Sequence, residues 1–115
     1  MIQSIFDDLL PSPRELDAFI ATHVLQWQEV HCDQGHDMYV GKPPESTTES
    51  QVPRFTEQED LVATVRAALH RLGYCVQATP VPEGWRVQAG NAAATSRTLP
   101  LALCASAWQA LKAGP

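Results

Sequence analysis

The sequence predicts a small α+β domain in which helices pack on a small antiparallel sheet. Three observations support this class: two helix starts marked by capping boxes, two strand-like segments joined by a turn, and an apolar helical face near the C-terminus. The chain has 115 residues, 44% of them hydrophobic, which is enough for one modest core. We therefore expect a single domain over residues 1–115.

A helix is predicted from Pro13 to about Leu25. Residues 12–15, Ser-Pro-Arg-Glu, form a capping box in which the Ser12 hydroxyl accepts from the Glu15 amide and Glu15 reaches back. Apolar residues then recur at helical spacing as far as Trp27. The apolar cluster within residues 1–10 has the same spacing and fits a short helix ended by Pro11.

Residues 28–53 lack a regular pattern, and Met38–Val40 is their one strand-like segment. Residues 42–51 are polar and proline-bearing, a composition typical of a surface loop. We therefore predict a flexible loop at 42–53 that lies outside the core.

A second helix is predicted after another capping box, Thr56 to Glu59. Its apolar stripe extends from Leu61 to Leu72 and stops at Gly73, a typical C-terminal cap. This is the most strongly patterned helix in the chain.

The last third of the chain predicts a hairpin followed by a helix. Residues 74–79 and 85–89 have strand patterns, and residues 80–84 between them have turn composition. Residues 90–96 are small and are predicted to form a loop. Apolar positions from 99 to 111 lie on one helical face, with Pro100 in the first turn.

Composition limits the classes of function. The net charge is −5, and the eight Lys and Arg residues are scattered, which disfavours direct binding to nucleic acid. Three cysteines are an odd number, and no secretory signal pattern begins the chain, so a reduced cytoplasmic setting is expected. No apolar run has the roughly 18 to 20 residues of a membrane span.

Three segments carry a resemblance to a known family: residues 13–27, residues 55–76 and residues 99–111, in this order. Together they resemble the phage ABA sandwich domain family, a group of small phage and prophage proteins that largely lack an assigned activity. The resemblance implies a phage-related origin and an α-β-α sandwich, with helices on both faces of a small sheet. From this origin and the reduced setting expected from the cysteines, we expect the protein in the host cytoplasm. The polar loop at 42–51 is longer than the family pattern.

Residues 31–37, His-Cys-Asp-Gln-Gly-His-Asp, hold ligand types that zinc accepts at short spacing. A structural zinc site needs a second ligand pair, and His23, Cys75 and Cys104 lie on or beside apolar faces, so a polar turn is the favoured interpretation. Cys32 with His36 lacks an orienting third group for nucleophilic catalysis. We predict no metal, no cofactor and no catalytic residue.

Two functional hypotheses follow. The first is a nonenzymatic protein that binds and inhibits a host protein, with an anti-CRISPR-like role suggested by the phage context alone. Its contact surface is expected to be acidic and loop-borne, with these residues: Asp33, Asp37, Glu45, Glu49, Glu57, Glu59 and Asp60. The second is an oligomeric binder that sequesters a signalling nucleotide, with phosphates held by arginines. The candidate arginines are Arg54, Arg71, Arg86 and Arg97, which are dispersed along the chain.

Overall fold

The computed structural model describes residues 11–33 and 38–113. The first described helix is α2 (Pro13–Phe19), which continues as a π-helical turn, η1 (Ile20–Val24). Both halves of the predicted capping box are present: the Glu15 N–H donates to Ser12 Oγ at 3.3 Å, and the Ser12 N–H donates to Glu15 Oε1 at 3.1 Å. The predicted helix to about residue 25 is confirmed, whereas the short helix predicted within residues 1–10 lies outside the described residues.

Sheet A contains β1 (Gln28–Asp33), β2 (Met38–Lys42) and β3 (Ser50–Gln51), paired antiparallel in that order. The strand predicted at 38–40 is confirmed, but the expectation of irregular structure across the rest of 28–53 was wrong. A β-bulge between Gln28 and His31 interrupts the alternation of side chains in β1. Val52, at the end of the predicted loop, is buried in the core.

The second predicted helix begins later than its sequence pattern indicates. A 3₁₀ turn, η2 (Glu59–Leu61), precedes α3 (Val62–Arg71), and neither has a side-chain cap. Thr56 does not act as the predicted N-cap, because the first helical turn begins only at Glu59. Thr56 is instead buried, with its N–H donated to Asp17 Oδ1 at 2.8 Å. The C-terminal cap at Gly73 is confirmed: Gly73 has φ +97°, and the next residue, Tyr74, donates its N–H to Leu69 O at 3.0 Å.

Sheet B contains β4 (Val76–Val81), β5 (Gly84–Ala89) and β6 (Ala92–Ser96), also antiparallel and in chain order. The predicted hairpin is confirmed, but the loop predicted at 90–96 is largely the third strand. Gly90, with φ +60°, begins a two-residue turn that brings this alanine-rich segment back along β5. The predicted C-terminal helix is confirmed as α4 (Leu99–Ala113).

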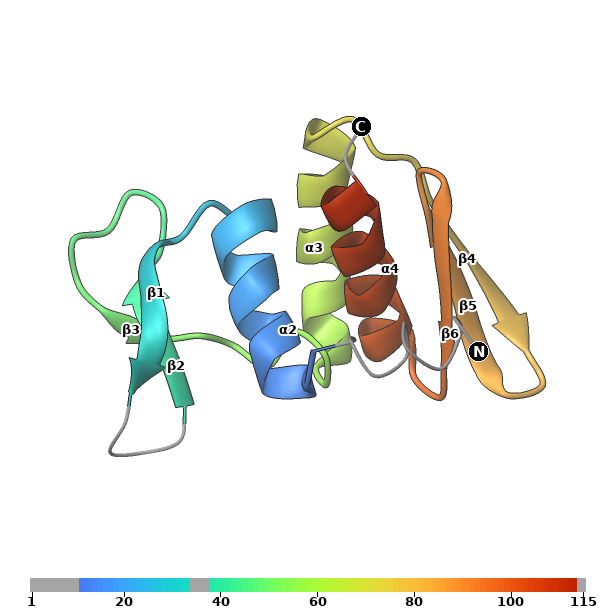
Figure 1. The fold of residues 1–115 in the computed structure, drawn as a ribbon, viewed down its shortest axis with the longest axis horizontal. Coiled ribbons are helices and arrows are strands. Elements are labelled where there is room, and N and C mark those ends of the chain that lie inside the picture. Colours follow the sequence, from blue (N-terminus) through green and yellow to red (C-terminus); the bar gives the residue numbers. More distant parts are fainter. Residues whose placement is uncertain (1–10, 34–37, 114–115) are drawn as a thin grey trace.

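The helices lie between the two sheets, with sheet A at one end of the molecule and sheet B at the other (Figure 1). The core joins the helices to sheet B, and its members include Ile20, Leu69, Val87 and Leu103, each at most 1% exposed. The α+β class is confirmed. The resemblance implies helices on both faces of one sheet, whereas the layers of the described residues run sheet, helices, sheet. None of the described helices is long and apolar enough to span a membrane.

Candidate protein-binding surface

The framework of sheet A depends on a close approach between β1 and β2 at the bulge. A Cβ added to Gly41 would lie 2.7 Å from Val30 Cγ2, so glycine is required where Val30 packs over β2. Glu29, inside the bulge, has φ +55° and pairs with Lys42 on the neighbouring strand, with 3.0 Å between Oε2 and Nζ. The bulge therefore places the Glu29 side chain at a position that it would not have in a strand with regular alternation of side chains.

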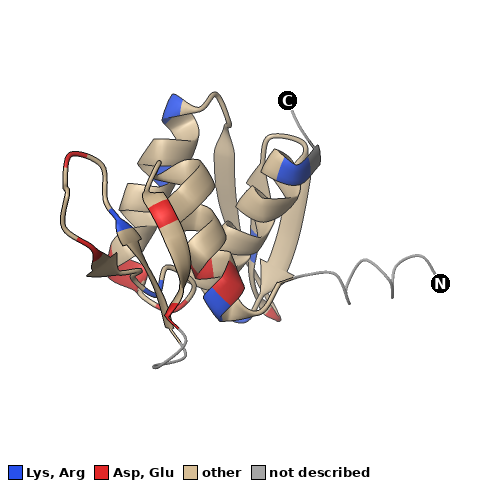
Figure 2. Cartoon of the chain, turned by 60° about the vertical axis from the view of Figure 1, so that its left-hand side comes forward, with Lys and Arg blue, Asp and Glu red and all other residues tan. Residues whose placement is uncertain are grey.

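Charge is distributed unevenly over the fold. The described residues of 28–60, which form sheet A, its connections and the start of η2, contain seven carboxylates and two basic side chains. The other described residues contain three carboxylates and six basic side chains. Figure 2 shows acidic residues gathered on the side of the molecule that carries sheet A and its long loop. We call this region, described residues 28–60, the acidic surface.

Most of the predicted contact residues belong to this surface and are exposed. The exposed ones are Glu45, Glu49, Glu57, Glu59 and Asp60. Asp33 is half-buried at the end of β1 and already has an interaction partner, and Asp37 lies outside the described residues. The structure therefore places five of the seven where a partner protein can reach them.

A histidine of β1 lies close to the loop between β2 and β3. His31 Nε2 lies 3.7 Å from Glu49 Oε2, and His31 Nδ1 lies 2.8 Å from the backbone oxygen of Glu29. Sequence reasoning missed Glu29 as a member of the acidic surface, because residues 28–33 were not predicted to form a strand. Its pairing with Lys42, thirteen positions away, leaves no local sequence signal.

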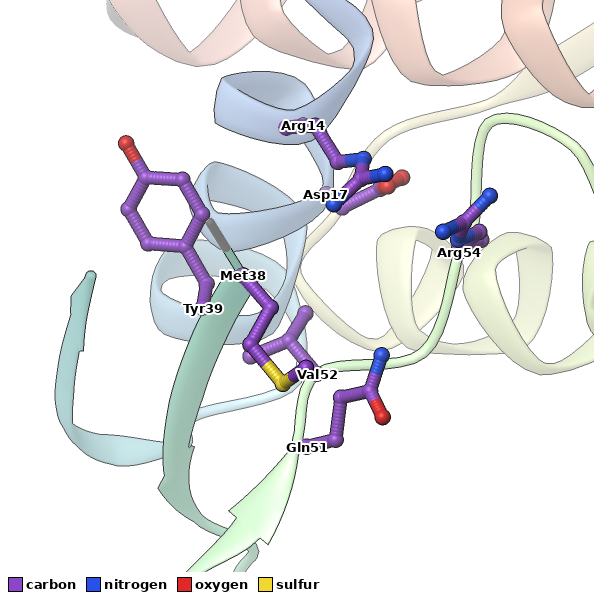
Figure 3. Close-up of a pocket in the computed structure, with 7 residues that line it drawn as sticks. All are labelled: Arg14, Asp17, Met38, Tyr39, Gln51, Val52 and Arg54. Atoms are coloured by element: carbon purple, nitrogen blue, oxygen red, sulfur yellow. The ribbon is translucent and has the colours of Figure 1, made fainter. Parts of the chain in front are cut away.

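A small cleft separates sheet A from α2 and is shown in Figure 3. Its volume is about 10 Å³, room for about one water molecule and too little for a nucleotide. The cleft is lined by Arg14, Asp17, Met38, Tyr39, Gln51, Val52 and Arg54.

Asp17 is the buried carboxylate of this cleft, with 3% of its surface exposed. Burial raises the pKa of Asp17 above its ordinary value, and hydrogen bonding from Thr56 opposes this shift. The charge of Glu57 adds to the rise, whereas the charge of Arg14 reduces it. The fold thus keeps the Asp17 carboxylate in a poorly hydrated position where its chief hydrogen-bond donor is the backbone N–H of Thr56.

The arginines of the nucleotide hypothesis do not meet at this cleft. Arg54 lines it together with Arg14, and Arg54 also lies 3.7 Å from Glu57. Arg71 ends α3, Arg86 belongs to β5, and Arg97 follows β6. No cluster of phosphate-binding arginines therefore forms among these four residues.

The candidate metal ligands do not form a group in the part of the chain that the structure describes. Within residues 11–33 and 38–113, no three His, Cys, Asp or Glu side chains are arranged to hold a metal ion. His36 lies outside these ranges. Cys32 and Cys75 are exposed, whereas Cys104 is buried in α4, and burial raises the pKa of its thiol. Cys104 is therefore a packed core residue, not an activated nucleophile.

No protein-family model, curated protein or solved structure matches this chain. The resemblance to the phage family stays a prediction. A role for the acidic surface therefore has to be inferred from its charges and its geometry.

Proposed function

We propose that this protein is a nonenzymatic binding protein whose acidic surface binds a basic surface of another protein. The separation of charge between residues 28–60 and the rest of the described chain is the observation that supports this most directly. In the phage context of the resemblance, the partner is a host protein that becomes inhibited. An anti-CRISPR-like role is one specific form of this proposal and rests on the resemblance alone.

The exposed carboxylates contribute little to the fold, which leaves them available to a partner. Glu49 and Glu57 have ion-pair distances of 3.7 Å at half-exposed positions, and pairs of this kind are worth little in water. Clustered charge of one sign accelerates encounter with an oppositely charged surface, and salt weakens this effect. Binding to a basic partner should therefore be fast and sensitive to ionic strength.

The experiment begins with capture of partners from a bacterial lysate by the tagged chain, followed by native mass spectrometry of the complex. With the partner identified, the double variant Glu45→Lys/Glu49→Lys is compared with Glu83→Lys, an exposed charge reversal in the β4–β5 turn. We expect the association rate to fall about tenfold or more in the double variant and to change little in the control. The difference should shrink at high salt.

The proposal fails if reversal of all five exposed carboxylates leaves binding and inhibition intact. An empty capture, followed by thermal stabilisation of the chain by a nucleotide, would favour the small-molecule hypothesis instead. A bound protein whose affinity responds equally to Glu83→Lys would move the contact surface away from sheet A.

A further inference from the structure

Within residues 11–33 and 38–113, the outer edge of β6 has backbone groups without a partner. Gly90 N–H donates to Cys75 O at 2.9 Å. This bond fixes which residues of β4 and β5 direct their N–H and C=O groups toward each other and which direct them away. Residues 85, 87 and 89 therefore direct their backbone groups toward β6, where they face residues 96, 94 and 92. It follows that Ala93 and Thr95 direct their N–H and C=O groups away from β5, at the edge of the described sheet.

The opposite edge of sheet B is protected. By the same alternation, Val76, Ala78 and Pro80 direct their backbone groups away from β5. Pro80 has no N–H to offer, and Val76 O accepts a hydrogen bond from Arg66 Nη2 at 3.3 Å. Proline and a covering charged side chain are the usual means by which edge strands avoid pairing with another chain.

In the part of the chain that the structure describes, the edge of β6 has neither a proline nor a covering charged side chain. Residues 92–96 are three alanines, a threonine and a serine, with no charge and no proline. We propose that the edge of β6 pairs antiparallel with β6 of a second copy of this chain, about a two-fold axis at Ala94. Ala93 then faces Thr95 of the other copy on both sides of the axis, which gives about four backbone hydrogen bonds.

The surroundings of β6 suit a second copy. At the axis the two Ala94 side chains meet, and these are small enough for the close spacing of a pair that is not hydrogen-bonded. The two copies of Arg86, on β5, are about 16 Å apart, since they are separated by three strand spacings across the sheet and two residues along it. This is beyond the screening length of about 8 Å in physiological salt. Repulsion between these two side chains is therefore weak.

The position of α4 also fits this arrangement. α4 contacts both β5 and β6 on one face of sheet B, so the two α4 helices lie about 10 Å apart in the dimer. This is the distance at which helices pack. Because the two-fold axis is perpendicular to sheet B, the helices and sheet A of both copies lie on the same side of the joined sheet, and the two acidic surfaces face the same side of the dimer (Figure 1).

The test measures the mass of the chain by sedimentation velocity over a range of micromolar concentrations. We expect the wild type to have twice the 12.6 kDa mass of one chain, and Thr95→Pro to be a monomer because its edge N–H is lost. Ala78→Pro is the matched control, since it removes an edge N–H at the equivalent position of β4 and should stay dimeric. Circular dichroism checks that each variant is folded.

A second measurement remains informative if Thr95→Pro does not fold. Ala94→Cys, made together with Cys32→Ser and Cys75→Ser, should form a disulfide-linked dimer under mild oxidation, whereas Thr79→Cys in the same background should not. A monomeric wild type, a dimeric Thr95→Pro variant or an absent Ala94→Cys cross-link overturns the proposal. A monomer that loses a protein partner on Thr95→Pro also overturns it, because the edge would then belong to a partner's strand.

Discussion

The buried carboxylate of Asp17 accepts a 2.8 Å hydrogen bond from the backbone N–H of Thr56, across 39 positions of sequence. The bond joins α2 to the segment that leads from sheet A into η2. Both residues are at least 97% buried, so water does not compete well for either group. Loss of the acceptor would leave a buried N–H without a partner, which is the costly form of a broken hydrogen bond.

Two substitutions at Asp17 separate the acceptor from the charge. Asp17→Ala removes the acceptor, and we expect it to lower the free energy of unfolding by about 2 kcal/mol. Asp17→Asn keeps an oxygen for the Thr56 N–H and removes a poorly hydrated charge, so its effect should be below about 1 kcal/mol. Urea unfolding at pH 7 measures both. Equal losses for the two variants would show that the charge, not the acceptor, stabilises this position.

The raised pKa of Asp17 predicts a specific dependence of stability on pH. Burial makes the folded state hold this proton more tightly than the unfolded state, whose carboxyl titrates near the ordinary value of 3.8. The stability that protonation of Asp17 contributes is therefore fully present below pH 3.8 and is lost as the pH rises through the folded-state pKa. We expect the stability of the wild type relative to Asp17→Asn to fall over this window and then stay constant. A difference that rises with pH instead would contradict the assigned shift.

Glycine is required at position 84 by close contacts, but at position 73 only by its backbone angle. At Gly84, with φ +141°, an added Cβ would lie 2.6 Å from Arg97 O and closer still to Ser96 O. At Gly73, with φ +97°, nothing lies within 4 Å. We expect Gly84→Ala to cost about 3 kcal/mol or more and Gly73→Ala about 1 kcal/mol. Thermal unfolding of the two variants tests this order, and similar melting temperatures would contradict it.

The three cysteines should differ in reactivity. Cys32 and Cys75 are exposed and should react with a thiol reagent in the native state, whereas Cys104 is buried and burial raises the pKa of its thiol. We expect two thiols to react promptly and the third to react only on addition of denaturant. Cys104→Ser serves as the control, since it should leave the prompt phase unchanged. Prompt reaction of three thiols would contradict the burial of Cys104.

The sequence predicted those parts of the fold whose signals are local. The Ser12 to Glu15 capping box and the glycine cap at Gly73 act within one turn of a helix, so their residue types suffice to recognise them. β6 was missed because alanine has little intrinsic preference for a strand, and its structure comes from pairing with β5. Thr56 was misassigned because the helical segment begins only at Glu59, and the bond that holds Thr56 comes from Asp17, 39 positions away, which leaves no local signal.

The acidic surface was predicted only as a set of residue types. The exposed glutamates were visible in the sequence, but their position on one end of the molecule depends on the pairing of β1, β2 and β3. Glu29 could not be included, because a bulge removes the alternation that identifies a strand. Charge separation between the two ends of the fold depends on the three-dimensional structure.

Sheet B and α4 are consecutive in the chain, and its strands are joined by turns of two residues. Contacts of this kind have low contact order, so we expect residues 76–113 to form early in folding. Sheet A and α2 pack on this unit through contacts between residues that are far apart in sequence. The bond between Asp17 and Thr56 is one contact of this kind. We therefore expect the acidic surface to belong to the part of the chain that folds last and opens first. A partner bound there would slow amide hydrogen exchange in β1 and β2 more than in β5.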